Sequence, residues 1–391
     1  MRNAWWLLLL VLALSACGDD GADAPLDSAA GSGGASGSTS DGGDASGNAA
    51  GTPAAGNTGP WAVGALPYDV AAGAAIEAPS DQWTFVGFPD SKCANGTATG
   101  IAVSTIASPI GLLVFMQGGG ACWDADTCLV TKSSVHLEDD VGEATVLAEA
   151  GGLSGLFDHG NAANPFREFA YVYMPYCTGD LHAGTSAQIY DAGAGPVTIE
   201  HHGGRNVEQY LERLVATFPN IERVVVSGIS AGGFGATFNW WRYQGAFPHA
   251  RVDIWDDAGL LVDPTDTRWQ TMAHAWEMVL PPGCDACAER MSAWLPFYGE
   301  HLVAPRRYAL SGYLGDAVIG QYFGLSSPQI EAQMLTLRQD ASANQKTFFL
   351  SGTGHSVIGE GALTVASDGS SLLPWILQYA GDDGAWDHAG P

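Results

Sequence analysis

The chain has 391 residues, 46% of them hydrophobic, and is long enough to bury a substantial core. Its formal net charge at pH 7 is −27, from 15 Lys and Arg against 42 Asp and Glu. A surface of that charge repels phosphate backbones, which disfavours nucleic acid as a partner. The same field disfavours strongly anionic polysaccharides unless a local basic patch compensates.

Residues 1–17, MRNAWWLLLLVLALSAC, have the pattern of an export signal: one Arg, an apolar run too short to span a bilayer comfortably, then small residues. The last four, Leu14 to Cys17, resemble a bacterial lipobox, which predicts lipidation of Cys17 and a membrane anchor there. Ordinary cleavage nearby with release as a soluble protein is the alternative. Either way the protein leaves the cytoplasm, as a cell-envelope lipoprotein or a secreted protein.

Residues 18–60 contain no aromatic residue, no Lys or Arg and a single Leu. Such a segment cannot bury enough apolar surface to offset the entropy of ordering, so we expect a disordered Gly/Ala/Ser/Asp linker. Residues 61–391 then form one large catalytic domain, and we expect it to be a monomer.

Six cysteines follow Cys17, and an even number in an exported chain predicts three disulfides, for which 15 connectivities exist. Proximity favours Cys122 with Cys128 and Cys284 with Cys287, which leaves Cys93 to pair with Cys177. The Cys284-x-x-Cys287 pair is alternatively a redox motif or half of a zinc site, although no second C-x-x-C is present.

From residue 111 onward, apolar runs alternate with helical patterns. The expected strands are GLLVFMQ (111–117), FAYVYMPY (169–176), RVVV (223–226), VDIWDD (252–257), RYALSG (307–312) and KTFFLSG (346–352), with helices at 206–218 and 233–247. Buried strands interleaved with helices predict an α/β fold with a mainly parallel sheet covered on both faces. In such sheets the chemistry lies at the carboxyl ends of the strands.

Two glycine-rich segments follow strands of this series. Gly118-Gly119-Gly120 comes after the first, where backbone N–H groups can approach a substrate; in isolation a tight turn is the favoured explanation, and pairing with the serine segment reverses that preference. Ser230 lies in GISAG between a strand and a helix, as a nucleophile elbow requires. With 27 serines and 52 glycines, about half of one G-x-S-x-G match is expected by chance, so the strand–serine–helix context carries the prediction.

Strand order then assigns the other catalytic residues of an α/β-hydrolase-like fold, in which the acid follows the second strand after the nucleophile and the base follows the last. These positions are Asp316 and His355. Asp257 is the alternative acid, and Asp256 and Asp257 are otherwise interpreted as loop or pocket residues. His388, the competing base, lies close to the C-terminus.

These residues predict an acyl-enzyme mechanism. His355 accepts the Ser230 proton, Asp316 orients the imidazole, and the amides of Gly119, Gly120 and Ala231 form the oxyanion hole. We expect no metal and no cofactor.

The chain resembles the pectin acetylesterase and Notum family of exported serine carboxylesterases. The matching stretches are WTFVGFPDSKCANGTATG, VFMQGGGACWDADTC, YVYMPYCTGDLHAG, VVVSGISAGGFGA, DDAGL, GDAVIGQYFG and GTGHSVIG, spread over residues 83–359. The resemblance implies the same roles for Ser230, Asp316 and His355 and the same oxyanion hole, and its cysteine pattern supports a bridge from Cys122 to Cys128. Plant members read Gly-Trp-Cys where this chain has Gly120-Ala121-Cys122, which replaces a bulky pocket wall with a methyl group.

Asp180 and His182 match the family but have no role derivable from the sequence; a loop braced by the Asp side chain is favoured over a metal pair. His201 and His202 are expected at the surface. The predicted function is hydrolysis of acetyl or other acyl esters, with plant polysaccharide such as pectin as the expected substrate. The alternatives are a fatty-acyl ester deacylase and a non-catalytic glycan-binding lipoprotein on the same fold.

Overall fold

A computed structural model describes residues 59–358 and 365–391. The predicted signal, the lipidation site at Cys17 and nearly all of the predicted linker lie outside the described residues, so those expectations stay predictions. None of the helices in the described part of the chain has the length and hydrophobicity needed to cross a bilayer.

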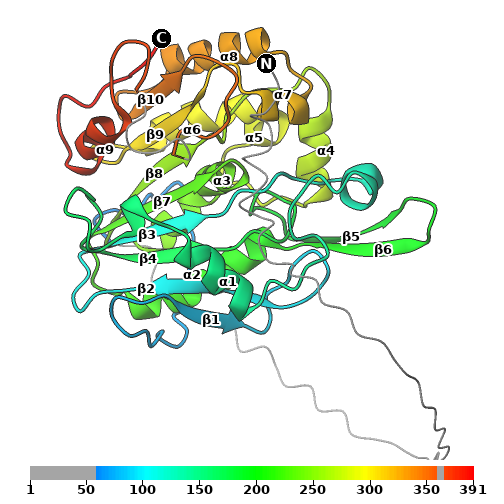
Figure 1. The fold of residues 1–391 in the computed structure, drawn as a ribbon, viewed down its shortest axis with the longest axis horizontal. Coiled ribbons are helices and arrows are strands. Elements are labelled where there is room, and N and C mark those ends of the chain that lie inside the picture. The colour runs from blue at the N-terminus through cyan, green and yellow to red at the C-terminus, as the bar shows by residue number, and fades with distance from the viewer. Residues whose placement is uncertain (1–58, 359–364) are drawn as a thin grey trace, which may run out of the picture. The chain divides into compact units, whose positions relative to one another are not determined.

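An eight-stranded sheet forms the centre of the domain, in the order β1-β2-β4-β3-β7-β8-β9-β10 (Figure 1). Its strands are β1 (Thr84–Phe88), β2 (Thr99–Ser104), β3 (Gly111–Met116), β4 (Phe169–Met174), β7 (Arg223–Ile229), β8 (Arg251–Asp257), β9 (Tyr308–Tyr313) and β10 (Gln345–Leu350). The six strands from β4 to β10 in this order pair in parallel, whereas β2 pairs antiparallel with both β1 and β4. A separate hairpin consists of β5 (Ser186–Asp191) and β6 (Pro196–His201).

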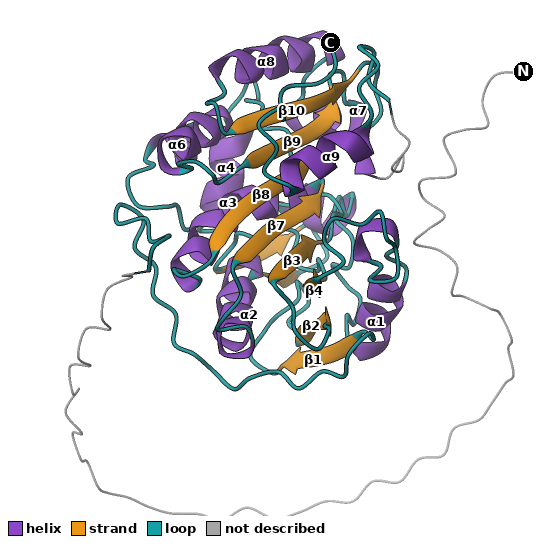
Figure 2. Ribbon diagram, turned by 90° about the vertical axis from the view of Figure 1, so that its left-hand side faces the viewer, coloured by secondary structure: helices purple, strands orange, loops and turns teal. Residues whose placement is uncertain are grey.

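Helices cover both faces of this sheet (Figure 2). They are α1 (Glu143–Gly151), α2 (Gly203–Thr217), α3 (Ala231–Ala246), α4 (Arg268–Ala275), α5 (Ala286–Glu289), α6 (Trp294–His301), α7 (Ala317–Phe323), α8 (Ser327–Asp340) and α9 (Leu372–Ala380). Short helical turns occur at Asp126–Val130, Gly155–Phe157 and Met291–Ala293. α2 and α3 lie on one face, and α1 and α9 on the other.

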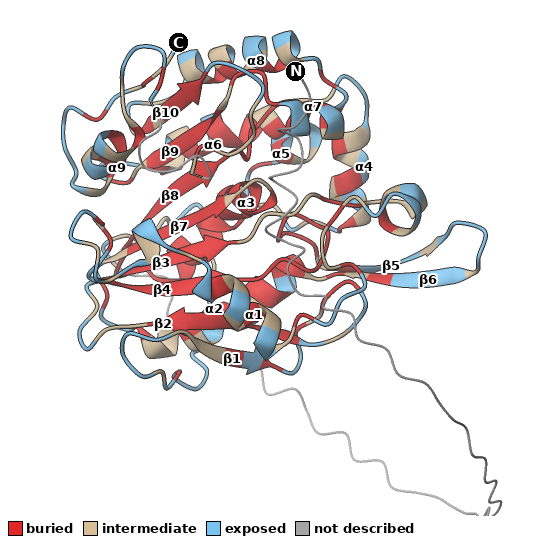
Figure 3. Cartoon of the chain, in the orientation of Figure 1, coloured by how far each residue is buried: buried red, intermediate tan, exposed pale blue. Residues whose placement is uncertain are grey.

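The burial pattern agrees with this layered arrangement. Every residue of β2, β3, β4 and β8 is buried, as expected for strands covered on both faces (Figure 3). All 16 residues of α3 are buried as well, because it packs on β3, β7 and β8 and is covered in turn by α2. The β5–β6 hairpin is largely exposed instead.

The predicted α/β-hydrolase-like architecture is therefore confirmed, with shifted boundaries. The helix expected at 206–218 spans Gly203–Thr217, and the one expected at 233–247 begins at Ala231, directly behind Ser230. The antiparallel strands β1 and β2 and the hairpin were not predicted. Their mixed polar and apolar composition carries no strong strand signal, and pairing with a neighbouring strand supplies what local propensity lacks.

Three disulfides join the six cysteines of the domain, and all three predicted pairs are confirmed. They are Cys93–Cys177, Cys122–Cys128 and Cys284–Cys287. The Cys122–Cys128 bridge closes the loop that follows the three glycines, and the Cys122 carbonyl accepts a hydrogen bond from Trp276 Nε1 at 2.9 Å. The C-x-x-C segment is thus a disulfide in this structure.

Candidate active site

Ser230 lies at the sharp turn between β7 and α3. Its φ is +57° and its ψ is −120°, a region that non-glycine residues rarely adopt. A hydrogen bond of 2.7 Å from the Ser230 N–H to the Asp257 carbonyl oxygen holds the turn. The flanking glycines are needed sterically, because a side chain on Gly228 would collide with the Gly232 carbonyl and one on Gly232 with that of Met116. The geometry matches the strained strand–serine–helix turn that a nucleophile elbow requires.

Asp316 and His355 follow β9 and β10 and contact each other. The His355 Nδ1 lies 2.7 Å from Asp316 Oδ2. The other oxygen, Oδ1, accepts the N–H groups of Val318 and Ile319 at 2.9 and 3.0 Å, so the carboxylate caps α7. Asp316 is fully buried, whereas the imidazole is 20% exposed. In the neutral imidazole whose Nδ1–H donates this hydrogen bond to Asp316, the other ring nitrogen, Nε2, can accept a proton.

Ser230 and His355 are brought to the same edge of the sheet. Within residues 59–358 and 365–391, no hydrogen bond joins the two side chains. Bonds of this kind are often long in unliganded enzymes and tighten when substrate binds.

Asp257, the alternative acid, has a different role. Its buried carboxylate accepts the Ser356 hydroxyl at 2.6 Å and the N–H groups of Val357 and Ile358, immediately after His355. It also accepts the Ser311 hydroxyl at 2.6 Å. Burial raises the pKa of Asp257, and the hydrogen bonds oppose that increase. Asp257 therefore holds the loop that carries His355, while Asp316 pairs with the imidazole.

The neighbouring Asp256 faces the other way, toward α3. Its carboxyl group accepts hydrogen bonds from Thr237, Tyr308 and the Gly259 N–H, at 2.8 to 3.1 Å. Burial raises its pKa to about 8. The interpretation of both residues as loop or pocket side chains was wrong: each is a fully buried member of β8 with structural partners.

The glycine run lies directly against the elbow. A side chain on Gly118 would meet the Ile229 carbonyl oxygen at 2.5 Å, and both Gly119 and Gly120 have positive φ, +148° and +82°. In the described part of the chain, the N–H groups of Gly119, Gly120 and Ala231 donate no hydrogen bond. Unpaired amides at this point are available to a developing oxyanion.

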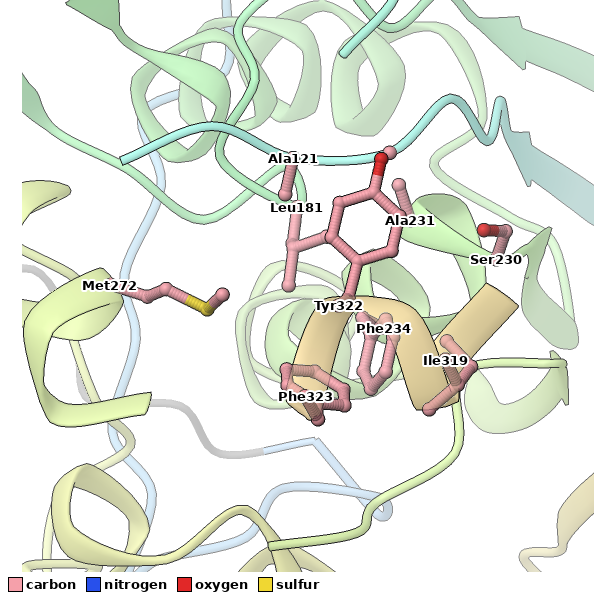
Figure 4. A pocket seen from close by; sticks show the side chains of 10 residues that line it. Ala121, Leu181, Ser230, Ala231, Phe234, Met272, Ile319, Tyr322 and Phe323 are labelled. Atoms are coloured by element: carbon pink, nitrogen blue, oxygen red, sulfur yellow. The ribbon is translucent and has the colours of Figure 1, made fainter. Parts of the chain in front are cut away.

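A small apolar pocket opens beside Ser230 (Figure 4). It is lined by Gly120, Ala121, Leu181, Ser230, Ala231, Phe234, Met272, Ile319, Tyr322 and Phe323. Its cavity volume is about 20 Å³. A single water molecule needs about 10–15 Å³ on this measure, so the pocket accommodates a group of one or two heavy atoms.

Comparison with known proteins gives the family. A family model described as Pectinacetylesterase matches residues 83–284, just over half of the chain. The chain belongs to the pectinacetylesterase family. The match includes the glycine run and Ser230 but ends before Asp316 and His355, so those two assignments rest on geometry and strand order.

The chain is similar both to palmitoleoyl-protein carboxylesterases and to a pectin acetylesterase. The chain is 27% identical over 160 residues to palmitoleoyl-protein carboxylesterase NOTUM of Schmidtea mediterranea, covering 39% of this chain and 29% of that protein. It is 26% identical over 157 residues to pectin acetylesterase 11 of Arabidopsis thaliana, covering 39% and 38%. For palmitoleoyl-protein carboxylesterase notum2 of Xenopus laevis the values are 22% over 233 residues, 54% and 46%. The alignments thus span less than half the length of these relatives.

In this pectinacetylesterase-family chain, Asp180 braces its own loop as predicted. Its fully buried carboxylate accepts the Thr178 hydroxyl at 2.6 Å and the N–H groups of Gly203 and Gly184 at 2.7 and 3.1 Å. Burial raises its pKa to about 6.

His182 supports the glycine run from behind. Its Nε2 donates to the Gln117 carbonyl oxygen at 2.9 Å, and burial lowers its pKa to about 4, so the ring is neutral at pH 7. The Gln117 side chain is also held, by the Tyr176 N–H at 2.8 Å and by Glu149 at 3.1 Å. Gln117, which precedes Gly118, is therefore held by these three partners. The sequence near Gln117 gives no signal of this role, because the partners lie 32 to 65 residues away.

The expectation that both His201 and His202 lie at the surface was wrong for His201. That ring is fully buried, with Nδ1 donating to the Thr178 carbonyl at 2.9 Å and Nε2 lying 3.2 Å from the Tyr190 hydroxyl. Residues on opposite sides of a strand do face apart, but here one side faces the core. His201 also lies near Cys122 and Cys128, whose sulfurs are bonded to each other and offer no thiolate to a metal.

Proposed function

We propose that the protein is a serine carboxylesterase that removes small acyl groups, with acetyl esters on a polysaccharide as the leading substrate class. Ser230 Oγ attacks the acyl carbon while His355 Nε2 accepts its proton. Asp316 orients the ring and stabilises the imidazolium that forms. The proton then passes to the leaving alcohol, and water hydrolyses the acyl-enzyme.

The observation that carries this proposal is the 2.7 Å hydrogen bond between His355 and Asp316, at the edge of the sheet where the strained Ser230 turn lies. The unpaired amides of Gly119, Gly120 and Ala231 support an oxyanion hole there. Each such donor contributes about 3 kcal/mol to stabilising a tetrahedral intermediate in comparable enzymes.

The pocket favours acetyl over fatty-acyl esters. A cavity of about 20 Å³ lined by apolar side chains accommodates a methyl group, and this volume supports a short acyl group over a long one. Similarity to the palmitoleoyl-protein carboxylesterases therefore supports a common mechanism, while the pocket supports the acyl size named for the Arabidopsis relative.

We further propose that the protein acts outside the cytoplasm, anchored through lipid at Cys17 or secreted. The three disulfides support an oxidising compartment, because cytosolic thiols are kept reduced.

A fluorophosphonate probe tests the nucleophile directly, because it reacts covalently with an activated serine. Wild type should be labelled at Ser230, and Ser230→Ala should lose both labelling and hydrolysis of p-nitrophenyl acetate, by about 10³-fold or more. Ser227→Ala is the matched control: Ser227 lies in β7, three residues before Ser230, but its hydroxyl donates to the Val114 carbonyl, so labelling should persist. Undiminished labelling of Ser230→Ala or His355→Ala would overturn the proposal. Release of acetate from acetylated pectin and acetylated xylan then identifies the polymer.

A further inference from the structure

The helix that begins at Asp316 also forms one wall of the pocket. Ile319, Tyr322 and Phe323 of α7 all line the cavity, and their spacing of three and four residues places them on one face of the helix. Figure 4 shows the Tyr322 ring extending from α7 across the pocket toward Ala121. In this view, Ala231 and Ser230 lie to the right of the ring. The acid and the pocket wall thus belong to one rigid element.

The Tyr322 ring is held at both ends. Its base is part of α7, and its hydroxyl donates to the Ser133 carbonyl oxygen. Ser133 is itself attached to the segment after the glycine run, through its hydroxyl to the Ala121 carbonyl at 2.6 Å and its carbonyl to the Ala121 N–H at 3.2 Å. Burial raises the pKa of Tyr322, so the hydroxyl remains a donor at neutral pH.

The glycine run makes room for this tyrosine. A side chain on Gly120 would collide with the Tyr322 hydroxyl and the Ser133 carbonyl. Ala121 is buried and presents only a methyl group to the pocket. The bulk on this side of the pocket comes from Tyr322, on a different element.

We propose that Tyr322 is the specificity-determining residue of the acyl pocket, closing it so that it accepts an acetyl group and excludes acyl chains of four or more carbons. This rests on the proposed esterase function. The phenol ring occupies the volume into which a longer chain would extend, and its hydrogen bond to Ser133 keeps it from rotating away. Removing the ring should open the cavity while leaving Ser230, His355 and Asp316 in place, because Tyr322 contributes no hydrogen bond to any of them.

The experiment compares kcat/KM for p-nitrophenyl acetate, butyrate and hexanoate across wild type, Tyr322→Ala, Tyr322→Leu and Tyr322→Phe. Wild type should prefer acetate. The ratio of butyrate to acetate should rise at least 10-fold in Tyr322→Ala and by a smaller factor in Tyr322→Leu. Tyr322→Phe is the matched comparison: it keeps the volume of the ring but loses the hydrogen bond to Ser133, so its ratio should rise by less than in Tyr322→Ala.

Different results separate this proposal from the one on which it depends. If wild type hydrolyses acetate but the ratio is unchanged in both Tyr322→Ala and Tyr322→Leu, Tyr322 does not set acyl length and only this inference falls. A wild type that prefers hexanoate would overturn it too. If wild type hydrolyses none of the esters, the esterase function itself is refuted. Tyr322→Leu preserves more of the packing, so the comparison holds even if Tyr322→Ala does not fold.

Discussion

Asp257 connects the backbone of Ser230 with the loop that carries His355. Its carbonyl oxygen accepts the Ser230 N–H, and its carboxylate accepts three donors from residues 356–358. A buried acceptor with several N–H and O–H donors is a strong constraint, since each hydrogen bond contributes about 0.5–1.5 kcal/mol. Asp257 is therefore a positioning residue: it touches no reacting atom but sets where the base lies relative to the nucleophile.

We expect Asp257→Asn to lower kcat by about 10- to 100-fold with KM changed less than threefold. Both carboxylate oxygens accept the Val357 N–H, at 3.1 and 3.0 Å, so in either orientation the amide turns its NH2 group toward that N–H. The loop should therefore shift, and a displacement of about 1 Å in a catalytic group costs on that order. Steady-state kinetics with p-nitrophenyl acetate provide the measurement.

Asp256→Asn is the matched control for that substitution, one residue away and equally buried. Its partners Thr237 and Tyr308 are hydroxyl groups that can accept as well as donate, so the amide is accommodated and kcat should stay within threefold of wild type. Equal losses in the two variants would mean that Asp257 acts only through general stability.

Asp256 also makes a specific prediction for the pH dependence of stability. Burial raises its pKa from 3.8 to about 8, so the folded protein holds a proton that the unfolded chain releases above about pH 4. The stability from this group is fully present below pH 4 and is lost as pH rises toward 8.

Asp256→Asn cannot ionise. Its unfolding free energy relative to wild type should therefore increase by more than about 1 kcal/mol between pH 5 and pH 8, and its Tm relative to wild type should rise with it. Asp180 and Asp257, whose pKa values are also raised, are present in both proteins and largely cancel in the difference. Thermal melts followed by circular dichroism at several pH values give the comparison, and a difference that does not vary with pH would refute the prediction.

At the scale of elements, the junction of β3, β7 and α3 depends on close backbone approach. Gly228 and Gly232 lie where β7 turns into α3 against the end of β3, and neither has space for a Cβ atom. A glycine in a helix normally costs stability relative to alanine, so its use here indicates a steric requirement.

Gly232→Ala should therefore destabilise the domain by about 1–3 kcal/mol and reduce labelling of Ser230, because the new methyl group displaces the end of β3 or the turn. Gly151→Ala is the control, since Gly151 is also helical but nothing lies within 4 Å of an added Cβ there. Chemical denaturation of the two variants is the measurement. A Gly232→Ala protein as stable as Gly151→Ala would show that the turn relaxes freely.

The helices and strands also show which parts of the fold could be predicted from the sequence and which could not. Six strands, β3, β4, β7, β8, β9 and β10, could be predicted because long apolar runs are typical of buried parallel strands, and Asp316 and His355 followed from their positions after β9 and β10. The start of α3 was placed two residues late, because small residues such as Gly232 and Gly233 give a weak helix signal that the packing on β7 and β8 overrides.

At the scale of the whole molecule, the dominant property is the net charge of −27. A field of this sign lowers the local concentration of an anionic polymer, and salt screens it, with a Debye length of about 10 Å at 0.1 M. It therefore affects how a polysaccharide reaches the site and has little effect on a neutral substrate.

We expect acetate release from acetylated pectin with free carboxylates to increase a few-fold between about 10 and 150 mM NaCl, as measured by initial rates. Acetylated xylan of low charge, assayed in parallel, should show little change. A rate on pectin that falls as salt is added would indicate a basic patch at the binding surface, contrary to this prediction.

The sequence alone was sufficient for properties with a local origin: the parallel sheet, the Ser230 turn, the strand ends that carry Asp316 and His355, and the two disulfides between neighbouring cysteines. The tertiary structure decided what depends on residues far apart in the chain. It made Asp316, and not Asp257, the partner of His355. It also buried His201 and brought Tyr322 against Gly120, which lies 202 positions earlier in the chain. The physical reason is that periodicity and turn chemistry act over a few residues, whereas these contacts exist only once the packed sheet and helices bring distant side chains together.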